Sequence, residues 1–352
     1  MGDSMKFLVL GAGNTGKAYS AYLLSKGHKV TLYDRNIDRL SGLRIHKLKA
    51  SGAISGEFSP ELTNSLHCVK DNDVILVCTV AEGHKPLARA LKGALVPGQL
   101  VIVTNGCWGA VEFDQVLGRE ADEKNCVLAE TGGQLILCGS PSPDEVYVKT
   151  IKQRMTLACV HSQHTTETLN RLKEVFPQFV PGNSVLDTSL NNSNPMIHVP
   201  LVLFNATRLE NGEDYLLFRT GMTAKVAEFV EKMDKERVEV IKACGVQPKT
   251  ELEMLNEFWP ETQPTLLDVF RNTPAYQVTK GPKSLNHRYL SEDLPYGLIP
   301  YLILGKKFNI NTPCLQALVN ILGLYAGVDF FALAPDLSEL DFERYLEPNA
   351  TV

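Results

Sequence analysis

Short runs of almost wholly apolar residues recur through the first half of the chain. The clearest are residues 6–10, 29–33, 73–79, 100–104 and 126–129. Runs of this length without polar alternation are typical of parallel strands that are covered on both faces. Segments of helical character separate them, such as residues 15–25, closed by Gly27, and residues 85–94, which stop before Pro97 and Gly98. This alternation predicts a doubly wound α/β sheet.

The pattern changes after residue 134. Residues 135–160 hold short strand-like runs with turn residues between them, and they predict a hairpin extension of the sheet. A helix is expected at residues 165–175, and residues 177–183 have the composition of a linker. We therefore expect the first domain to cover residues 5–183.

Helical patterns take over in the second half. The apolar positions of one long helix recur at helical spacing: Met222, Val226, Phe229, Val230 and Met233. Thr220 is its expected N-cap and Gly245 its expected end, and a further helix is expected at residues 315–324. The second domain, residues 184–352, is therefore predicted to be mostly α-helical.

A glycine-rich sequence follows the first apolar run directly: Gly11-Ala12-Gly13-Asn14-Thr15-Gly16. The first glycine allows a tight turn, the second lets the backbone approach a pyrophosphate, and the third lets the next helix pack closely. The amino end of that helix attracts anions. Although a surface turn can also be glycine-rich, the strand before it and the helix after it favour a Rossmann-type dinucleotide-binding domain.

The second strand ends in an acidic residue, Asp34, which lies 18 residues after Gly16. At this place a carboxylate can bind the ribose hydroxyls of a dinucleotide. Asp34 would repel a 2′-phosphate, whereas Arg35 beside it can bind one, so NAD is favoured and NADP stays open. Thr79 and Asn105 follow later strands and are expected to face the cofactor.

Length and charge limit the class of protein. At 352 residues the chain exceeds the size at which one core usually stays single, so two domains are expected. Hydrophobic residues make up 44% and charged residues 21%, and the net charge is −5. This balance is typical of a globular protein without general affinity for nucleic acid or anionic membranes.

The eight cysteines form no C-x-x-C pair, and we expect them to be free thiols in a reducing compartment. Cys107 is an alternative candidate for a reactive thiol, but no neighbour in sequence would lower its pKa. His161 and His164 alone do not make a metal site, and no metal is predicted. Because the N-terminus lacks an apolar signal core, a cytoplasmic location is expected.

Asn194-Pro195 opens the helical half and is followed by His198. With Asn194 as N-cap and Pro195 as the first helical residue, Asn194 and His198 share one face of the first turn. Their roles remain open at this point, because a capping amide and a histidine bound to local backbone explain the pattern equally well.

A second polar segment, residues 286–297, brings charged residues together with proline and glycine. Asp293 is a candidate partner that would orient the ring of His198, and Arg288 can bind a carboxylate in a fork. The same charges would also suit a solvated turn.

These two segments resemble the opine dehydrogenases, the octopine and nopaline dehydrogenase family. The matching motifs are Asn194-Pro195-x-x-His198 and His287-Arg288-Tyr289-x-x-x-Asp293-x-Pro295-x-Gly297-x-x-Pro300. The resemblance implies that His198 is the catalytic histidine and Asp293 its carboxylate partner. It further implies that Asn194 is the neighbouring amide and that Arg288 binds a substrate carboxylate.

The resemblance implies NAD(P)H-dependent reductive condensation of an amino acid with a 2-oxo acid such as pyruvate. One alternative is the simple reduction of a 2-oxo acid, as in ketopantoate reductases, although no lysine stands in a matching motif for the base. Another is a dinucleotide-binding sensor without catalysis. The sequence leaves the amino acid open, and it leaves open whether the chain forms a homodimer.

Overall fold

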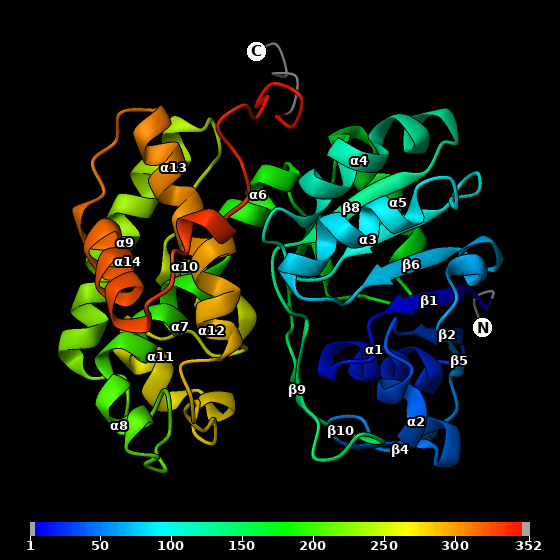
Figure 1. Ribbon diagram of the computed structural model, residues 1–352, viewed down its shortest axis with the longest axis horizontal. Coiled ribbons are helices and arrows are strands. Elements are labelled where there is room, and N and C mark those ends of the chain that lie inside the picture. Colours follow the sequence, from blue (N-terminus) through cyan, green and yellow to red (C-terminus); the bar gives the residue numbers. More distant parts are fainter. Residues whose placement is uncertain (1–3, 347–352) are drawn as a thin grey trace. The chain divides into compact units, whose positions relative to one another are not determined.

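The computed structural model describes residues 4–346, and its first half is built on an eight-stranded sheet (Figure 1). The strands are β1 (Lys6–Leu10), β2 (Lys29–Tyr33), β5 (Glu61–Thr63), β6 (Val74–Val77), β7 (Leu100–Val103), β8 (Val127–Thr131), β11 (Met155–Cys159) and β12 (Phe179–Pro181). The helices of this half are α1 (Asn14–Ser25), α2 (Asp38–Ile45), α3 (His84–Leu91), α4 (Gly109–Glu123) and α5 (Thr165–Leu172). The predicted α/β alternation is confirmed.

The strand order is β12-β11-β8-β7-β6-β1-β2-β5, with β1 pairing in parallel with both β2 and β6. All four residues of β6 and of β7 are buried, as their unbroken apolar sequences predict. Because the chain leaves β1 toward β2 on one side and β6 lies on the other, the order reverses beside β1. Ligands of open α/β sheets bind outside the carboxyl ends of the strands at such a point.

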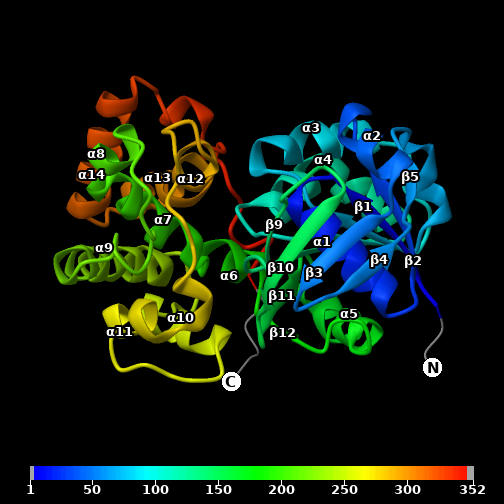
Figure 2. The same cartoon turned by 90° about the horizontal axis from the view of Figure 1, so that it is seen from below.

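The region predicted as a hairpin extension of the main sheet divides between two sheets. Residues 155–159 form β11, which extends the main sheet antiparallel to β8, whereas the strands before it belong to a separate four-stranded sheet. It has the order β4-β3-β10-β9 and consists of β3 (Leu48–Gly52), β4 (Gly56–Phe58), β9 (Ile136–Gly139) and β10 (Glu145–Ile151) (Figure 2). Helix α1 contacts strands of both sheets, and Lys17 Nζ donates to the carbonyl oxygens of Ser142 (3.3 Å) and Pro143 (3.1 Å). The prediction is therefore confirmed for β11 and wrong for β9 and β10, because β10 pairs with β3, whose weakly apolar sequence did not predict a strand.

The expected linker at residues 177–183 contains a strand instead. Its residues Phe179–Pro181 form β12, which pairs in parallel with β11 at the edge of the main sheet. Pro181 lacks a backbone N–H, and an edge strand tolerates this. A three-residue strand that contains proline gives too short an apolar pattern to be recognised.

The chain divides into two compact units, Met1–Thr188 and Ser189–Val352, with the division inside α6 (Val185–Leu190). The domain limits proposed from sequence, 5–183 and 184–352, stay a prediction. The second unit is helical, as predicted. Its elements are α7 (Ser193–Phe204), α8 (Ala206–Glu210), α9 (Ala224–Ala243), α10 (Glu251–Phe258), α11 (Leu266–Asn272), α12 (Arg288–Ser291), the π-helical η5 (Leu294–Leu298), α13 (Ile299–Lys307) and α14 (Pro313–Ala326).

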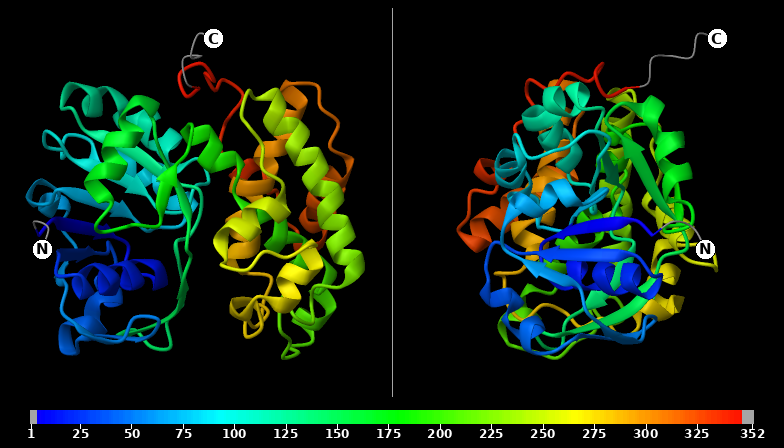
Figure 3. Two further views of the ribbon diagram at one scale, coloured as in Figure 1. Left: turned by 180° about the vertical axis from the view of Figure 1, so that it is seen from behind. Right: turned by 90° about the vertical axis from the view of Figure 1, so that its right-hand side faces the viewer.

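The long helix α9 stands out in Figure 3, and it follows the predicted apolar spacing. Val226, Val230 and Met233 are buried. Its N-cap is Thr223, whose side chain accepts from the N–H of Val226, and not Thr220. The hydroxyl of Thr220 is instead hydrogen bonded to the backbone of Leu216.

Between residues 4 and 346, no helix combines the length and apolar composition needed to cross a membrane.

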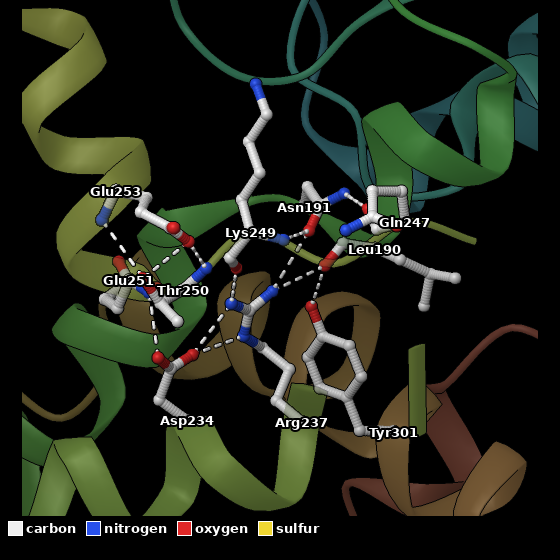
Figure 4. A network of polar contacts seen from close by, with 10 residues as sticks. All are labelled: Leu190, Asn191, Asp234, Arg237, Gln247, Lys249, Thr250, Glu251, Glu253 and Tyr301. Carbon is white, nitrogen blue, oxygen red and sulfur yellow. Dashed lines mark hydrogen bonds and ion pairs between the residues drawn. The ribbon is translucent and has the colours of Figure 1, made fainter. Parts of the chain in front are cut away.

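A buried arginine joins α9 to the chain that leads into α7 (Figure 4). Arg237 is fully buried, forms an ion pair with Asp234 (2.7 Å) and donates to the carbonyl oxygens of Leu190 (3.1 Å) and Lys249. Burial opposes its charge, but Asp234, Tyr301 and Glu251 together more than offset this effect and raise the pKa of Arg237. Tyr301 donates to the same Leu190 carbonyl (2.7 Å), so α9 and α13 both hold the start of α7.

The tightest backbone packing of the glycine motif is at Gly16. A Cβ atom there would lie 1.8 Å from the carbonyl oxygen of Gly11, whereas a Cβ at Gly13 would meet no atom within 4 Å. We expect Gly16→Ala to lower the free energy of unfolding by about 1–3 kcal/mol or more, as overpacking does. Gly13→Ala should leave it nearly unchanged. Urea unfolding without cofactor tests this, and equal stabilities of the two variants would contradict the packing.

Arg237→Leu should destabilise the helical unit, because it leaves the Asp234 carboxylate without its cation. Breaking a buried ion pair in this way costs about 3–5 kcal/mol. The double variant Arg237→Leu/Asp234→Leu should recover part of the loss. Urea unfolding of the three proteins measures this, and a single variant as stable as the double variant would show that the pair does not matter.

Candidate active site

The glycine-rich loop of the first unit offers mainly backbone groups to a ligand. Gly11 has φ +108°, and its N–H donates to the carbonyl oxygen of Tyr33 (2.8 Å). The space beside Gly13 is open, and Gly13 as N-cap of α1 supplies no side-chain acceptor for the first N–H groups of the helix. An open backbone at a helix amino end fits a pyrophosphate group.

The neighbouring side chains of the motif differ in their exposure. Asn14 is exposed, and Thr15 is half-buried with its hydroxyl 3.3 Å from Oε1 of Gln134. Both residues lie in the first turn of α1, where a bound phosphate would meet them. Gln134, which stands just before β9, did not follow from the sequence pattern.

Asp34 fastens the glycine loop to the end of β2. Its Oδ2 accepts from the N–H of Ala12 (2.9 Å) and its Oδ1 from the N–H of Asn36 (2.9 Å). Each carboxylate oxygen has a second lone pair, which is what ribose hydroxyls would use. Arg35 is exposed, and Nη1 of Arg39 lies 3.8 Å from Oδ2 of Asp34. A second arginine is therefore close to the Asp34 carboxylate.

Thr79 and Asn105 lie beyond the carboxyl ends of β6 and β7, as predicted. The hydroxyl of Thr79 is buried without a hydrogen-bond partner among the described residues, and Asn105 is almost fully buried. The loop after Asn105 has three successive residues in the left-handed region, of which Cys107 (φ 61°) is only 2% exposed. A thiol this deeply buried is poorly placed for attack on a ligand.

Asn192, and not Asn194, caps the first helix of the second unit. The Asn192 side chain accepts from the N–H of Asn194 (3.1 Å), and α7 begins at Ser193. The predicted cap was therefore two positions late, because both asparagines precede the apolar run. As a result Asn194 lies half-buried within the first turn, and His198 follows one turn later on the same face.

His198 and Asp293, 95 residues apart in sequence, are in direct contact. Nδ1 of His198 lies 2.7 Å from Oδ2 of Asp293. The Asp293 side chain is 1% exposed and that of His198 is 14% exposed. Since an ionised carboxylate only accepts hydrogen bonds, Nδ1 carries the proton, which leaves Nε2 to act as acceptor in the neutral ring.

A glycine makes this contact sterically feasible. Asp293 precedes η5, and η5 packs against α7. A Cβ atom at Gly297 would lie 2.1 Å from Cγ of Pro195, so only a bare backbone allows η5 to come this close to α7. The proline of the first motif and the glycine of the second therefore belong to one packing contact.

Arg288 begins α12, five residues before Asp293, and its side chain is 39% exposed. Its Nε lies 3.4 Å from Oε2 of Glu292, whose side chain is only 5% exposed. Glu292 thereby orients the guanidinium group, which can still bind a carboxylate on its exposed side. Glu292 was not predicted as a site residue, although its i,i+4 spacing from Arg288 is a signal in the sequence.

Tyr289 is a further neighbour of His198 that sequence analysis quoted only as part of a motif. Its ring is stacked on the imidazole, with 4.0 Å between the ring centroids and 27° between the planes. Only the folded chain shows this contact, because nothing in the spacing of Tyr289 and His198 predicts it.

Two family models match separate parts of the chain. Residues 181–325 match the family described as NAD/NADP octopine/nopaline dehydrogenase, alpha-helical domain. Residues 7–162 match the family described as ketopantoate reductase PanE/ApbA. The first match contains His198 and Asp293, and the second contains the glycine-rich loop.

Two solved structures share the fold. Yersinopine dehydrogenase with bound NADP+ has a TM-score of 0.74 at 16% identity and covers 98% of this chain and 97% of its own. Octopine dehydrogenase in complex with NADH and agmatine has a TM-score of 0.74 at 15% identity, with 92% and 90% covered. These structures confirm the predicted class, a Rossmann-type domain followed by a helical domain.

Curated proteins include relatives along nearly the full length. The vitopine synthase of Allorhizobium ampelinum is 19% identical over 355 residues, which cover 96% of this chain and 95% of that protein. The opine dehydrogenase of Arthrobacter sp. (strain 1C) is 33% identical over 339 residues, which cover 93% and 92%. With this identity along both chains, the protein belongs to the opine dehydrogenase family of NAD(P)-dependent oxidoreductases that act on CH–NH bonds.

Proposed function

We propose that this protein joins the amino group of an amino acid to the carbonyl carbon of a 2-oxo acid such as pyruvate and reduces the resulting imine. The product is a secondary amine that bears two carboxylates. The observation that carries this proposal is the His198–Asp293 pair, a half-buried imidazole held by a buried carboxylate. Such a pair can accept and return protons at neutral pH.

His198 serves two proton transfers in this reaction. Its Nε2 first takes a proton from the ammonium group, so that the amine can attack the carbonyl carbon and form a C–N bond. The same proton then goes to the hydroxyl of the carbinolamine, which leaves as water and gives the protonated imine. Asp293 stabilises the charged ring between these steps through the 2.7 Å contact to Nδ1.

Arg288 and Asn194 position the substrates. The guanidinium group of Arg288 binds a carboxylate in a fork, which fixes the orientation of the reacting carbon. Asn194 lies one turn before His198 and offers both a donor and an acceptor to the amine or the carbonyl oxygen. Neither residue exchanges protons in this scheme.

NAD(P)H, when bound, supplies the hydride that reduces the imine carbon. The residues we propose for holding it belong to the first unit: Gly11, Gly13, Asn14, Thr15, Gly16, Asp34, Arg35, Thr79 and Asn105. Among these, Gly13 gives the open backbone for the pyrophosphate, and Asp34 gives the acceptors for the ribose.

We further propose a cytoplasmic enzyme, because its cysteines show no spacing of a disulfide framework. A homodimer is compatible with the exposed apolar side chains on and after α14, such as Leu324 (86% exposed) and Phe331 (44% exposed). A second copy of the chain could bury such side chains if they form one contiguous patch, since patches of that kind commonly mark contact surfaces.

Oxidation of NAD(P)H should require an amino acid together with a 2-oxo acid. In this assay His198→Asn should lower kcat about 10²–10⁴-fold, since it removes the acid–base group. Asp293→Asn should lower kcat at least about tenfold, because an amide no longer stabilises the charged ring. Initial rates in a screen of amino acids against several 2-oxo acids measure these effects.

Two controls separate the roles. His46→Asn, at an exposed histidine of the first unit, should change nothing. Arg288→Ala should mainly raise the KM for a carboxylate substrate, since it removes binding more than proton transfer. Cofactor oxidation that needs no amine would instead support a simple 2-oxo acid reductase, and cofactor binding without turnover would support a sensor.

Cofactor preference should depend on Asp34. Asp34→Asn removes the charge that repels a 2′-phosphate and leaves Arg35 and Arg39 in place. The ratio of kcat/KM for NADH to that for NADPH should therefore fall by about tenfold, which corresponds to about 1.4 kcal/mol. Steady-state kinetics with both cofactors test this, and an unchanged ratio would contradict the proposed role of Asp34.

A further inference from the structure

We propose that Tyr289 is a positioning residue that acts through His198, a role that rests on the proposed function. Its aromatic face holds the plane of the imidazole and favours the protonated ring that forms during each proton transfer.

The two rings are arranged face to face. Their centroids are 4.0 Å apart and their planes differ by 27°. Asp293 contacts the imidazole at its edge, through Nδ1, so the two neighbours constrain different motions of the ring. The carboxylate limits rotation within the ring plane, whereas the stacked phenol limits tilting of that plane. Together they aim Nε2 in one direction.

Tyr289 is itself firmly held. Its backbone N–H donates to Nδ1 of His287 (3.3 Å), which makes His287 the N-cap of α12. The His287 ring also meets the Tyr289 ring edge-on, at 4.3 Å and 62°. The Tyr289 ring therefore lies between two imidazoles, stacked on that of His198 and edge-on to that of His287, and it cannot move without disturbing both neighbours.

The electrostatics around this stack favour a charged His198. An aromatic face attracts a cation, with an energy of about 0.5–2 kcal/mol that depends on solvation. Burial raises the pKa of the Tyr289 hydroxyl to about 12, so the phenol stays neutral. Burial, followed by Arg288 and His198, lowers the pKa of His287, so His287 stays neutral at working pH and does not compete.

The charged groups of α12 and the turn after it lie near the stack, and so does the phenol of Tyr215, whose pKa burial raises. Arg288 opposes a second positive charge, while Glu292 lies within 3.4 Å of Arg288 Nε and offsets it. Asp293 is thus the carboxylate in direct contact with His198, and Tyr289 is the face that supports it.

Two substitutions separate the ring from the hydroxyl. Tyr289→Phe keeps the aromatic face and should retain kcat within about threefold. Tyr289→Leu keeps much of the volume but removes the face, and should lower kcat about tenfold or more with little change in the KM of the 2-oxo acid. If Phe is as damaging as Leu, the hydroxyl is the important group and the proposal is wrong.

A double variant tests whether Tyr289 acts through His198. In a His198→Asn background, Tyr289→Leu should cause no further loss of kcat, because the group that it positions is already gone. Losses that multiply in the double variant would show general damage to the fold and would overturn the proposal.

A titration that needs no substrate gives an independent test. Full-length protein with isotope-labelled histidine is followed by NMR, and the signal that His198→Asn removes is the one from His198. Tyr289→Leu should move this signal downfield, since ring shielding is lost, and should shift its titration midpoint to lower pH by about half to one unit. Tyr289→Phe should do neither.

These experiments distinguish a failure of the proposed function from a failure of the proposed stacking role. A protein that shows the NMR effects but no amine-dependent turnover would refute the proposed function and keep the stacking role. An active enzyme in which Tyr289→Leu changes neither the NMR signal nor kcat would refute the stacking role and keep the function.

Discussion

The approach of η5 to α7 at Gly297 is the constraint on which the proposed catalytic chemistry depends. Pro195 occupies the space that a side chain at position 297 would need, so the two elements touch through a bare backbone. This contact carries Asp293 to within 2.7 Å of His198. A buried carboxylate without a partner would be costly, and the imidazole supplies that partner. The packing at Gly297 thereby fixes the geometry of the proposed acid–base pair.

The rest of the helical unit supports the same contact. The carbonyl oxygen of Leu190, just before α7, accepts from both Arg237 on α9 and Tyr301 on α13. Because α13 follows η5 directly, the helix that carries His198 and the segment that carries Asp293 share one anchor. The buried Arg237 charge is tolerated because Asp234 and backbone carbonyls surround it. The network therefore serves geometry more than net stability.

In the first unit, close packing likewise fixes the backbone, here that of the glycine-rich loop. Gly16 lies against the Gly11 carbonyl, and Asp34 holds the N–H of Ala12, so the loop is rigid before any ligand arrives. A preformed cradle lowers the entropy cost of binding. Lys17 adds a link from α1 to the second sheet, which explains why a lysine directly after the third glycine is almost fully buried.

Local pattern alone determined the strands β1, β2, β6 and β7, the glycine loop and the acidic end of β2, because these depend on nearest neighbours along the chain. Motif resemblance added His198 and Asp293 as candidates. Only the tertiary structure decided that they touch, that Asn192 caps α7, that residues 179–181 form a strand and that Tyr289 stacks on His198. The reason is physical: hydrophobic periodicity specifies which face of an element is buried, but distances between residues far apart in sequence follow from how closely backbones can approach.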